Sequence, residues 1–149
     1  MRTQTYNDDG SCQASEGIIN NLLPLPSAEA PTRTIREIWR ERFTENGWIS
    51  NYFIPESRQS ITLWKDMVGV CIQLGNTCRA STDLLKLETL FRLNRIEEAA
   101  LVVPSKTYAG FLGSNHASFA TAARDLSTFA PAITVPVTLI EFHPKDLKA

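Results

Sequence analysis

Residues 60–79 carry the clearest structural pattern in the chain and read Ser-Ile-Thr-Leu-Trp-Lys-Asp-Met-Val-Gly-Val-Cys-Ile-Gln-Leu-Gly-Asn-Thr-Cys-Arg. Along residues 67–74 large apolar residues alternate with Gly69, Cys71 and Gln73. This period of two predicts a strand. Residues 61–64 predict a shorter strand before it, with Lys65-Asp66 as the turn between the two. The stretch therefore predicts a β-hairpin.

The hairpin leads directly into a helix. Gly75-Asn76 interrupts the second strand, and the leucine-rich pattern that follows predicts a helix over residues 77–94. Cys71 and Gln73 lie two residues apart in the strand, so their side chains share one face. Two side chains placed in this way can line a common cleft.

The hairpin resembles the catalytic hairpin of the BglII-type restriction endonucleases, a family of the PD-(D/E)xK superfamily. In that family an Asp lies on the first strand, and the second strand runs apolar-Glu-apolar-Gln-apolar-Gly. Aligning the Lys65-Asp66 turn and the Gln73-Leu74-Gly75 end puts Thr62 at the position of the Asp. The same register puts Cys71 at the position of the Glu, and Gln73 alone matches the family residue.

The resemblance implies an α/β fold of the restriction-endonuclease type, a mixed sheet flanked by helices. It also implies phosphodiester cleavage with Mg²⁺, which polarises the phosphoryl group and activates water. Mg²⁺ prefers carboxylate oxygens and water, whereas Thr62, Cys71 and Gln73 offer a hydroxyl, a thiol and an amide. These positions predict a catalytically degenerate protein that binds no metal and needs no cofactor.

Relocated acids are the alternative to degeneracy. Glu56 precedes the hairpin and Glu88 lies within the following helix, and both are acids near the motif. If either reached the cleft, the protein would be an active Mg²⁺-dependent DNA endonuclease.

The helix over residues 77–94 carries more basic than acidic residues. The resemblance puts this helix near bound DNA, so Arg79, Lys86 and Arg92 are candidate DNA-binding residues. A solvated basic face explains the same residues equally well. Duplex DNA is the expected partner, and an immunity or regulatory protein that binds no nucleic acid is the alternative.

A second protein subunit is also expected. Members of the family pair two subunits through helices that flank the sheet, which implies a homodimer or a heterodimer with an active nuclease subunit. Leu90 and Leu93 extend the apolar stripe of the helix beyond the needs of one sheet face. We expect them to form an exposed patch of the kind that marks an interface.

The rest of the chain divides into an arm and a body. Residues 1–31 carry a net charge of minus three and several prolines, and they predict an extended acidic N-terminal arm. Residues 32–149 predict a single restriction-endonuclease-like domain. Its further elements are helices over residues 32–43 and 114–129 and strands over residues 48–54, 95–103 and 133–142. The strand over residues 95–103 follows a helix and is expected to run parallel to the hairpin.

Composition excludes several classes of protein. With 149 residues, 43% hydrophobic and 21% charged, the chain is typical of one globular domain. It contains no apolar run of membrane-span length, and its start does not resemble a signal peptide. Three cysteines without a pairing pattern indicate a reducing compartment, the cytoplasm. Neither His116 nor His143 has zinc-ligand spacing to a cysteine.

Overall fold

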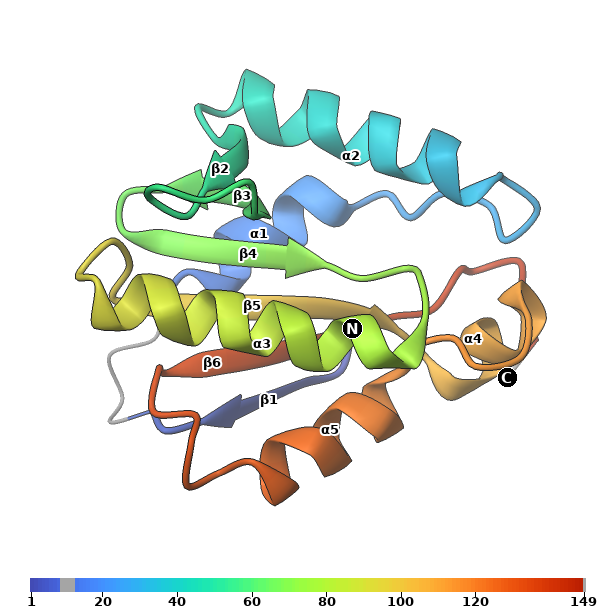
Figure 1. Ribbon diagram of the computed structural model, residues 1–149. Coiled ribbons are helices and arrows are strands. Elements are labelled where there is room, and N and C mark those ends of the chain that lie inside the picture. The colour runs from blue at the N-terminus through green and yellow to red at the C-terminus, as the bar shows by residue number, and fades with distance from the viewer. Residues whose placement is uncertain (9–12, 149) are drawn as a thin grey trace.

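The computed structural model describes residues 1–8 and 13–148, and within them a six-stranded sheet carries five helices (Figure 1). The strand order is β1-β6-β5-β4-β3-β2. The strands are β1 (Thr3–Tyr6), β2 (Ile49–Phe53), β3 (Ser60–Lys65), β4 (Val68–Ile72), β5 (Glu98–Pro104) and β6 (Val137–Phe142). The helices are α1 (Ser15–Leu22), α2 (Thr32–Glu45), α3 (Thr77–Arg92), α4 (Lys106–Leu112) and α5 (Phe119–Thr128).

The predicted hairpin and the parallel crossover are both confirmed. β3 and β4 are antiparallel, with Leu63 opposite Val70, and their turn has positive φ angles of 47° at Asp66 and 66° at Met67. Two left-handed residues in succession match the twist of the strands and allow this short connection. β4 then pairs in parallel with β5, with α3 as the connection. The sheet is mixed and flanked by helices, as the sequence predicts.

The period of two along the central strands divides the core in two. Val70 packs with residues of α1, α2 and α4 on one face of the sheet. Its neighbour Cys71 packs with residues of α3 and α5 on the other face. Figure 1 shows α3 and α5 in front of the sheet and α1 behind it. Because both faces are covered, β4 and β5 consist largely of buried residues.

The extended arm expected for residues 1–31 is not what the structure shows. β1 pairs antiparallel with β6, and α1 is a helix whose Ile18 and Leu22 are buried. The Trp39 indole N–H donates to the Leu22 carbonyl at 3.1 Å, which ties α1 to α2. The apolar patch of this segment gains more from burial than from solvation. Asp9 and Cys12, which the sequence also assigned to the arm, lie outside the described residues.

The region after β5 also differs from expectation. Residues 106–112 form α4, a helix that the sequence pattern does not predict, and α5 begins at Phe119 rather than near residue 114. Ser118 caps α5 by a reciprocal pair of hydrogen bonds with Thr121, which fixes the later start. His116 therefore precedes the helix instead of lying in its first turn.

Pro136 immediately precedes β6, which is an internal strand between β5 and β1. Leu90 is fully buried against the sheet, so it adds nothing to an exposed patch, whereas Leu93 is exposed. None of the helices in residues 1–8 and 13–148 is long and apolar enough to cross a membrane.

Candidate functional site

The site begins where β3 and β4 stop pairing. The backbone register between the two strands ends at Leu63 and Val70. Beyond that point the Thr62 hydroxyl oxygen accepts the N–H of Ile72 at 3.0 Å, so a side chain takes the place of a backbone partner. After β4 the chain stays paired with β5 instead, because the Gln73 N–H donates to the Val102 carbonyl at 2.9 Å. The two strands form a fork.

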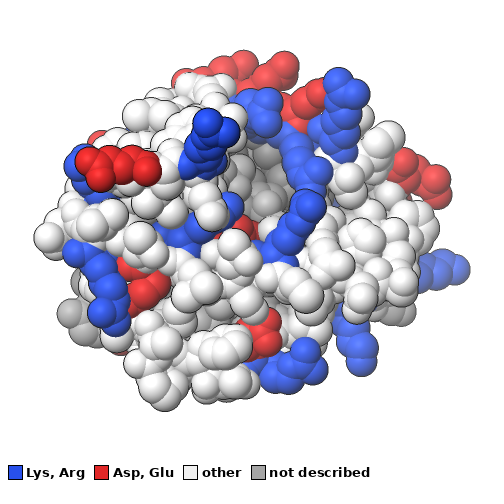
Figure 2. Space-filling model, viewed as in Figure 1, with Lys and Arg blue, Asp and Glu red and all other residues white. Residues whose placement is uncertain are grey.

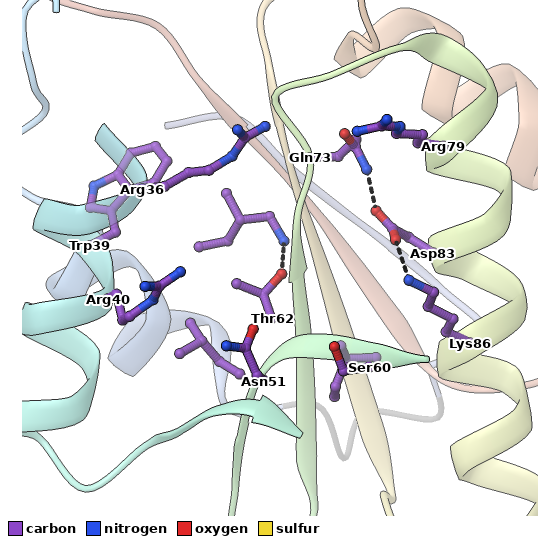
Figure 3. Close-up of a pocket in the computed structure, with 13 residues that line it drawn as sticks. Arg36, Trp39, Arg40, Asn51, Ser60, Thr62, Gln73, Arg79, Asp83 and Lys86 are labelled. Carbon is purple, nitrogen blue, oxygen red and sulfur yellow. Dashed lines mark hydrogen bonds and ion pairs between the residues drawn. The ribbon is translucent and has the colours of Figure 1, made fainter. Parts of the chain in front are cut away.

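A cavity of about 240 Å³ lies at this fork, between α2 and α3 (Figure 3). Side chains of α2 line one wall and side chains of α3 the other, and the strands supply the polar residues between them. The lining residues from the helices are Arg36, Trp39, Arg40, Arg79, Asp83 and Lys86. The polar ones from the strands are Asn51, Ser60 and Thr62, with Gln73 just after the end of β4.

Gln73 and Asp83 form a fixed pair in the wall (Figure 3). The Gln73 side-chain N–H donates to the Asp83 carboxylate at 2.7 Å, and the Gln73 side-chain oxygen accepts the N–H of Gly75 at 2.8 Å. Both ends of the amide are thus engaged, and its orientation is set. A Cβ atom at Gly75 would lie 2.9 Å from that oxygen, so glycine suits this position. Lys86 lies 3.9 Å from the second carboxylate oxygen.

Burial controls the protonation of Asp83, whose side chain is largely shielded from solvent. Desolvation raises the pKa of this carboxyl above its ordinary value of 3.8. The hydrogen bond from Gln73 and the charges of Lys86 and Arg79 act in the opposite direction, but they do not cancel the effect of burial.

The cavity is predominantly basic. Arg36, Arg40, Arg79 and Lys86 face a single acid, Asp83, among its described lining residues. Figure 2 shows Lys and Arg side chains gathered around a hollow, with acidic atoms visible among them. Such a distribution attracts anions, because cations along the walls of a low-dielectric cleft reinforce each other's potential.

Comparison with known proteins supplies the family. The family model described as restriction endonuclease BglII/BglIII matches residues 13–142. The chain belongs to the BglII/BglIII restriction endonuclease family. The resemblance stated from the hairpin residues is thereby confirmed at the level of the family.

Two solved structures of BglII share the fold. The crystal structure of restriction endonuclease BglII complexed with a DNA 16-mer is 17% identical, with a TM-score of 0.82 over 99% of this chain and 78% of that chain. The crystal structure of free BglII is also 17% identical, with a TM-score of 0.73 over 99% of this chain and 81% of that chain. No curated protein sequence matches the chain. The fold is that of BglII.

The three positions aligned with the hairpin of the BglII/BglIII family lie in different surroundings. Thr62 and Gln73 line the cavity. Cys71 does not line it, because its side chain is 1% exposed and packs in the core on the α3 side. Burial, and then the charge of Asp83, raise the pKa of the Cys71 thiol well above its usual range. The thiol is therefore neutral and part of the core.

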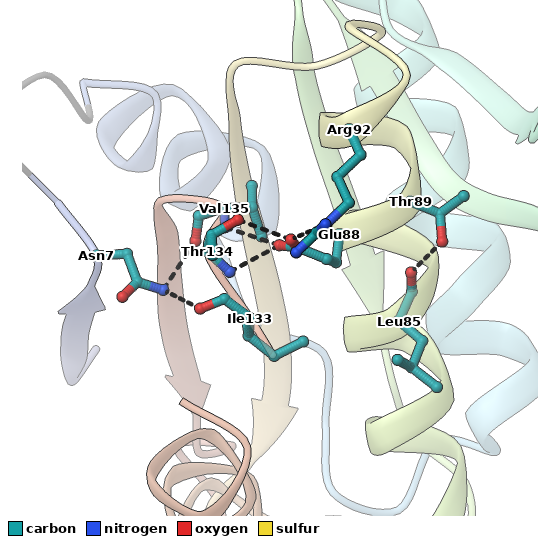
Figure 4. Close-up of polar contacts among 8 residues, drawn as sticks. All are labelled: Asn7, Leu85, Glu88, Thr89, Arg92, Ile133, Thr134 and Val135. Carbon is teal, nitrogen blue, oxygen red and sulfur yellow. Dashed lines mark hydrogen bonds and ion pairs between the residues drawn. The ribbon is translucent and has the colours of Figure 1, made fainter. Parts of the chain in front are cut away.

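The structure places neither relocated-acid candidate in the cavity. Glu56 is exposed in the turn between β2 and β3. Glu88 is buried and holds the segment that leads into β6 (Figure 4). Its carboxylate accepts the backbone N–H groups of Thr134 and Val135 at 2.8 Å each, and the Thr134 hydroxyl at 2.7 Å. With Arg92 donating to it at 2.7 Å as well, Glu88 is a structural residue.

The basic candidates divide in the same way. Arg79 and Lys86 line the cavity, whereas Arg92 is paired with Glu88 and does not. Sequence reasoning missed Arg36 and Arg40, although their spacing of four residues puts them on one face of α2. It also missed Asn51, whose φ of 53° within β2 has no signature in the sequence.

A magnesium ion would find a single carboxylate, Asp83, among the described residues that line the cavity. No group of three or more His, Cys, Asp or Glu residues that could hold a metal occurs among them. Asp83 offers one carboxylate, already bonded to Gln73 and close to Lys86. Magnesium sites commonly use one or two carboxylates together with substrate phosphates and water, so Asp83 by itself is a minimal set of protein ligands. His143 bonds to Ser105 and to the Leu147 carbonyl, and not to a described cysteine.

Proposed function

We propose that this member of the BglII/BglIII family binds duplex DNA through the cavity and does not cleave it. The observation that carries the proposal is the charge of the cavity, where four basic side chains face one carboxylate among the described lining residues. Phosphate contacts supply most of the affinity for nucleic acid, whereas hydrolysis in this fold requires carboxylates that hold a metal.

The cavity offers the donors that a phosphodiester group needs. Arg36 and Arg40 project from α2 toward the fork, with Arg79 on the opposite wall (Figure 3). Guanidinium groups bind phosphate oxygens with two parallel hydrogen bonds. The Thr62 hydroxyl accepts the Ile72 N–H, so its own proton remains available to donate. A backbone phosphate could therefore be held from three sides.

The same residues also support the absence of hydrolysis. Thr62 carries no charge, Cys71 is a buried thiol, and the Gln73 amide is engaged at both ends. Asp83 stands alone among the described acids of the cavity, with Lys86 beside it. These residues support binding of a phosphodiester without the metal that would activate water against it.

The experiment is duplex binding measured by fluorescence anisotropy over a series of salt concentrations. Replacing both α2 cations, Arg36→Gln with Arg40→Gln, should weaken binding and reduce the slope of log affinity against log salt by about 2 units. The matched control is Lys65→Gln with Arg95→Gln, which removes two charges near the β3–β4 turn and the start of β5. Equal slopes for the two double variants would contradict the proposal.

An active Mg²⁺-dependent endonuclease is the second candidate, and Asp83 is the observation that favours it. This acid lies in the cavity on α3, where Glu56 and Glu88 do not. Incubation of supercoiled plasmid with Mg²⁺ or Mn²⁺ tests it. Nicking by the wild type that disappears in Asp83→Asn would establish a relocated acid and overturn the non-cleaving proposal.

We further propose that the protein acts as a homodimer, or paired with an active nuclease subunit, in the cytoplasm. Cys71 and Cys78 are both free thiols, as is typical of a reducing compartment. A wild type that shows no salt-dependent binding to duplex DNA would instead favour an immunity or regulatory role through protein contacts.

A further inference from the structure

A second open groove, of about 470 Å³, lies between α4 and α5. Lys106 and Arg124 contribute its charged side chains, and its described lining contains no acid. The space beside Gly110 is open, since a Cβ atom there would meet nothing within 4 Å. Gly113 has a φ of 144°, which favours glycine.

The two cations of this groove are free to bind an anion. Lys106 and Arg124 are exposed, and neither forms an ion pair with an acid in the part of the chain that the structure describes. The acid next to Arg124 in the sequence, Asp125, accepts a hydrogen bond from Ser81 of α3 at 3.1 Å. That carboxylate is thus directed toward α3, and Asp125 is not among the residues that line the groove.

Backbone contacts join the groove to the cavity at the fork. The N–H of Thr77 donates to the Asn115 carbonyl at 2.8 Å, and the N–H of Ala117 donates to the Gly75 carbonyl at 2.8 Å. Asn76 and His116 form a β-bridge between the same two loops. The loop of residues 75–77 lies between Gln73 and Arg79, both of which line the cavity, while Asn115 and His116 line the groove.

We propose that the α4–α5 groove binds the sugar–phosphate backbone of the same duplex where it leaves the cavity. The inference rests on the proposed binding of DNA and extends it to a second, separate contact. Two acid-poor basic hollows held together by backbone hydrogen bonds form a track of fixed spacing. Successive phosphates of one strand are the repeated anions that such a track fits.

Neutralising the groove tests the proposal. In the anisotropy assay Lys106→Gln with Arg124→Gln should reduce the salt slope by about 2 units, as two lost phosphate contacts require. Lys65→Gln with Arg95→Gln is again the charge-matched control and should retain the wild-type slope. Because the substituted side chains are exposed, circular dichroism should show unchanged folding.

The outcomes separate the groove from the cavity. Combining the groove variant with Arg36→Gln and Arg40→Gln should reduce the slope by about 4 units, because the contacts are distinct. A groove variant with the wild-type slope, beside a weakened cavity variant, would overturn the groove and leave the DNA-binding proposal intact. A wild type that binds no duplex would overturn both.

Discussion

The charge of Asp83 bears on the proposed binding of phosphate. Its carboxylate accepts from Gln73 and lies near Lys86, and it is the single acid among the described residues that line the site. Burial raises its pKa, so the folded protein holds the Asp83 proton more tightly than the unfolded chain does. The charge of this one residue opposes both folding and the approach of phosphate.

The stability contributed by Asp83 should fall as the pH rises from its ordinary pKa of 3.8 through the raised value, because over that window the folded state binds more protons. Asp83→Asn has no such proton and keeps an acceptor for Gln73. The free energy of unfolding of Asp83→Asn relative to wild type should therefore increase across this window. Urea unfolding at a series of pH values measures it, and a difference independent of pH would contradict the assignment.

The sequence predicts this site in part. Alternation along β4 correctly puts Cys71 and Gln73 on one face, but it does not reveal how deep each lies. Cys71 is buried in the core, whereas Gln73 lines the cavity. Asp83 was missed because its role depends on where α3 packs over the end of β4, and that is a tertiary property with no local pattern.

Helix α3 contributes to the cavity near its start and contacts the segment before β6 further along. Its first two turns carry the cavity residues Arg79 and Asp83, and its fourth turn carries Glu88. Burial alone would raise the pKa of Glu88. The hydrogen bonds from Thr134, Arg92 and the Val135 amide outweigh burial and lower the pKa below its ordinary value of 4.5.

Glu88→Gln should destabilise the protein by about 2 kcal/mol at neutral pH, since it removes a charged acceptor of several hydrogen bonds. The depressed pKa means that the wild-type advantage exists above pH 4.5 and is lost as the pH falls through the folded value. Denaturant unfolding at neutral and acidic pH measures this, with exposed Glu97→Gln as the control. Loss of duplex binding without loss of stability would instead indicate a direct role in the site.

Element patterns predicted the centre of the fold better than its ends. The hairpin, the parallel crossover and α2 follow from strong periodicity and clear turns. The N-terminal segment was misassigned because prolines near residues 24–31 mask the short helix α1 before them. Its helix is stabilised by burial of Ile18 and Leu22 on α2, and not by a long local pattern.

For the whole molecule, charge distribution matters more than net charge. The chain has a formal charge of −1, yet the fold gathers basic side chains from α2 and α3 at one cavity. Composition gave no reason to expect a binder of phosphate. The arrangement arises from elements separated by more than thirty residues in the sequence.

Exposed leucines at α3 bear on the expected pairing of two subunits. Leu85 on α3 is 58% exposed and Leu93, directly after its last residue, is 47% exposed, and burial of both in a partner would be favourable. Sedimentation at micromolar concentration should show a dimer, and Leu85→Gln with Leu93→Gln should shift it to monomer. Phe111→Gln, which removes an exposed apolar side chain of α4, is the control. A monomeric wild type would contradict the homodimer.

If the cavity holds DNA without a catalytic metal, its affinity for duplex DNA should not depend on Mg²⁺. The most direct measurement is the affinity of the wild type for a labelled duplex, compared in EDTA and in Mg²⁺ at equal ionic strength, with the length of the duplex checked afterwards. We predict equal affinities and an intact duplex, because the cavity cations and not a bound ion neutralise the phosphates. Binding that requires Mg²⁺, or a shortened duplex, would contradict this account.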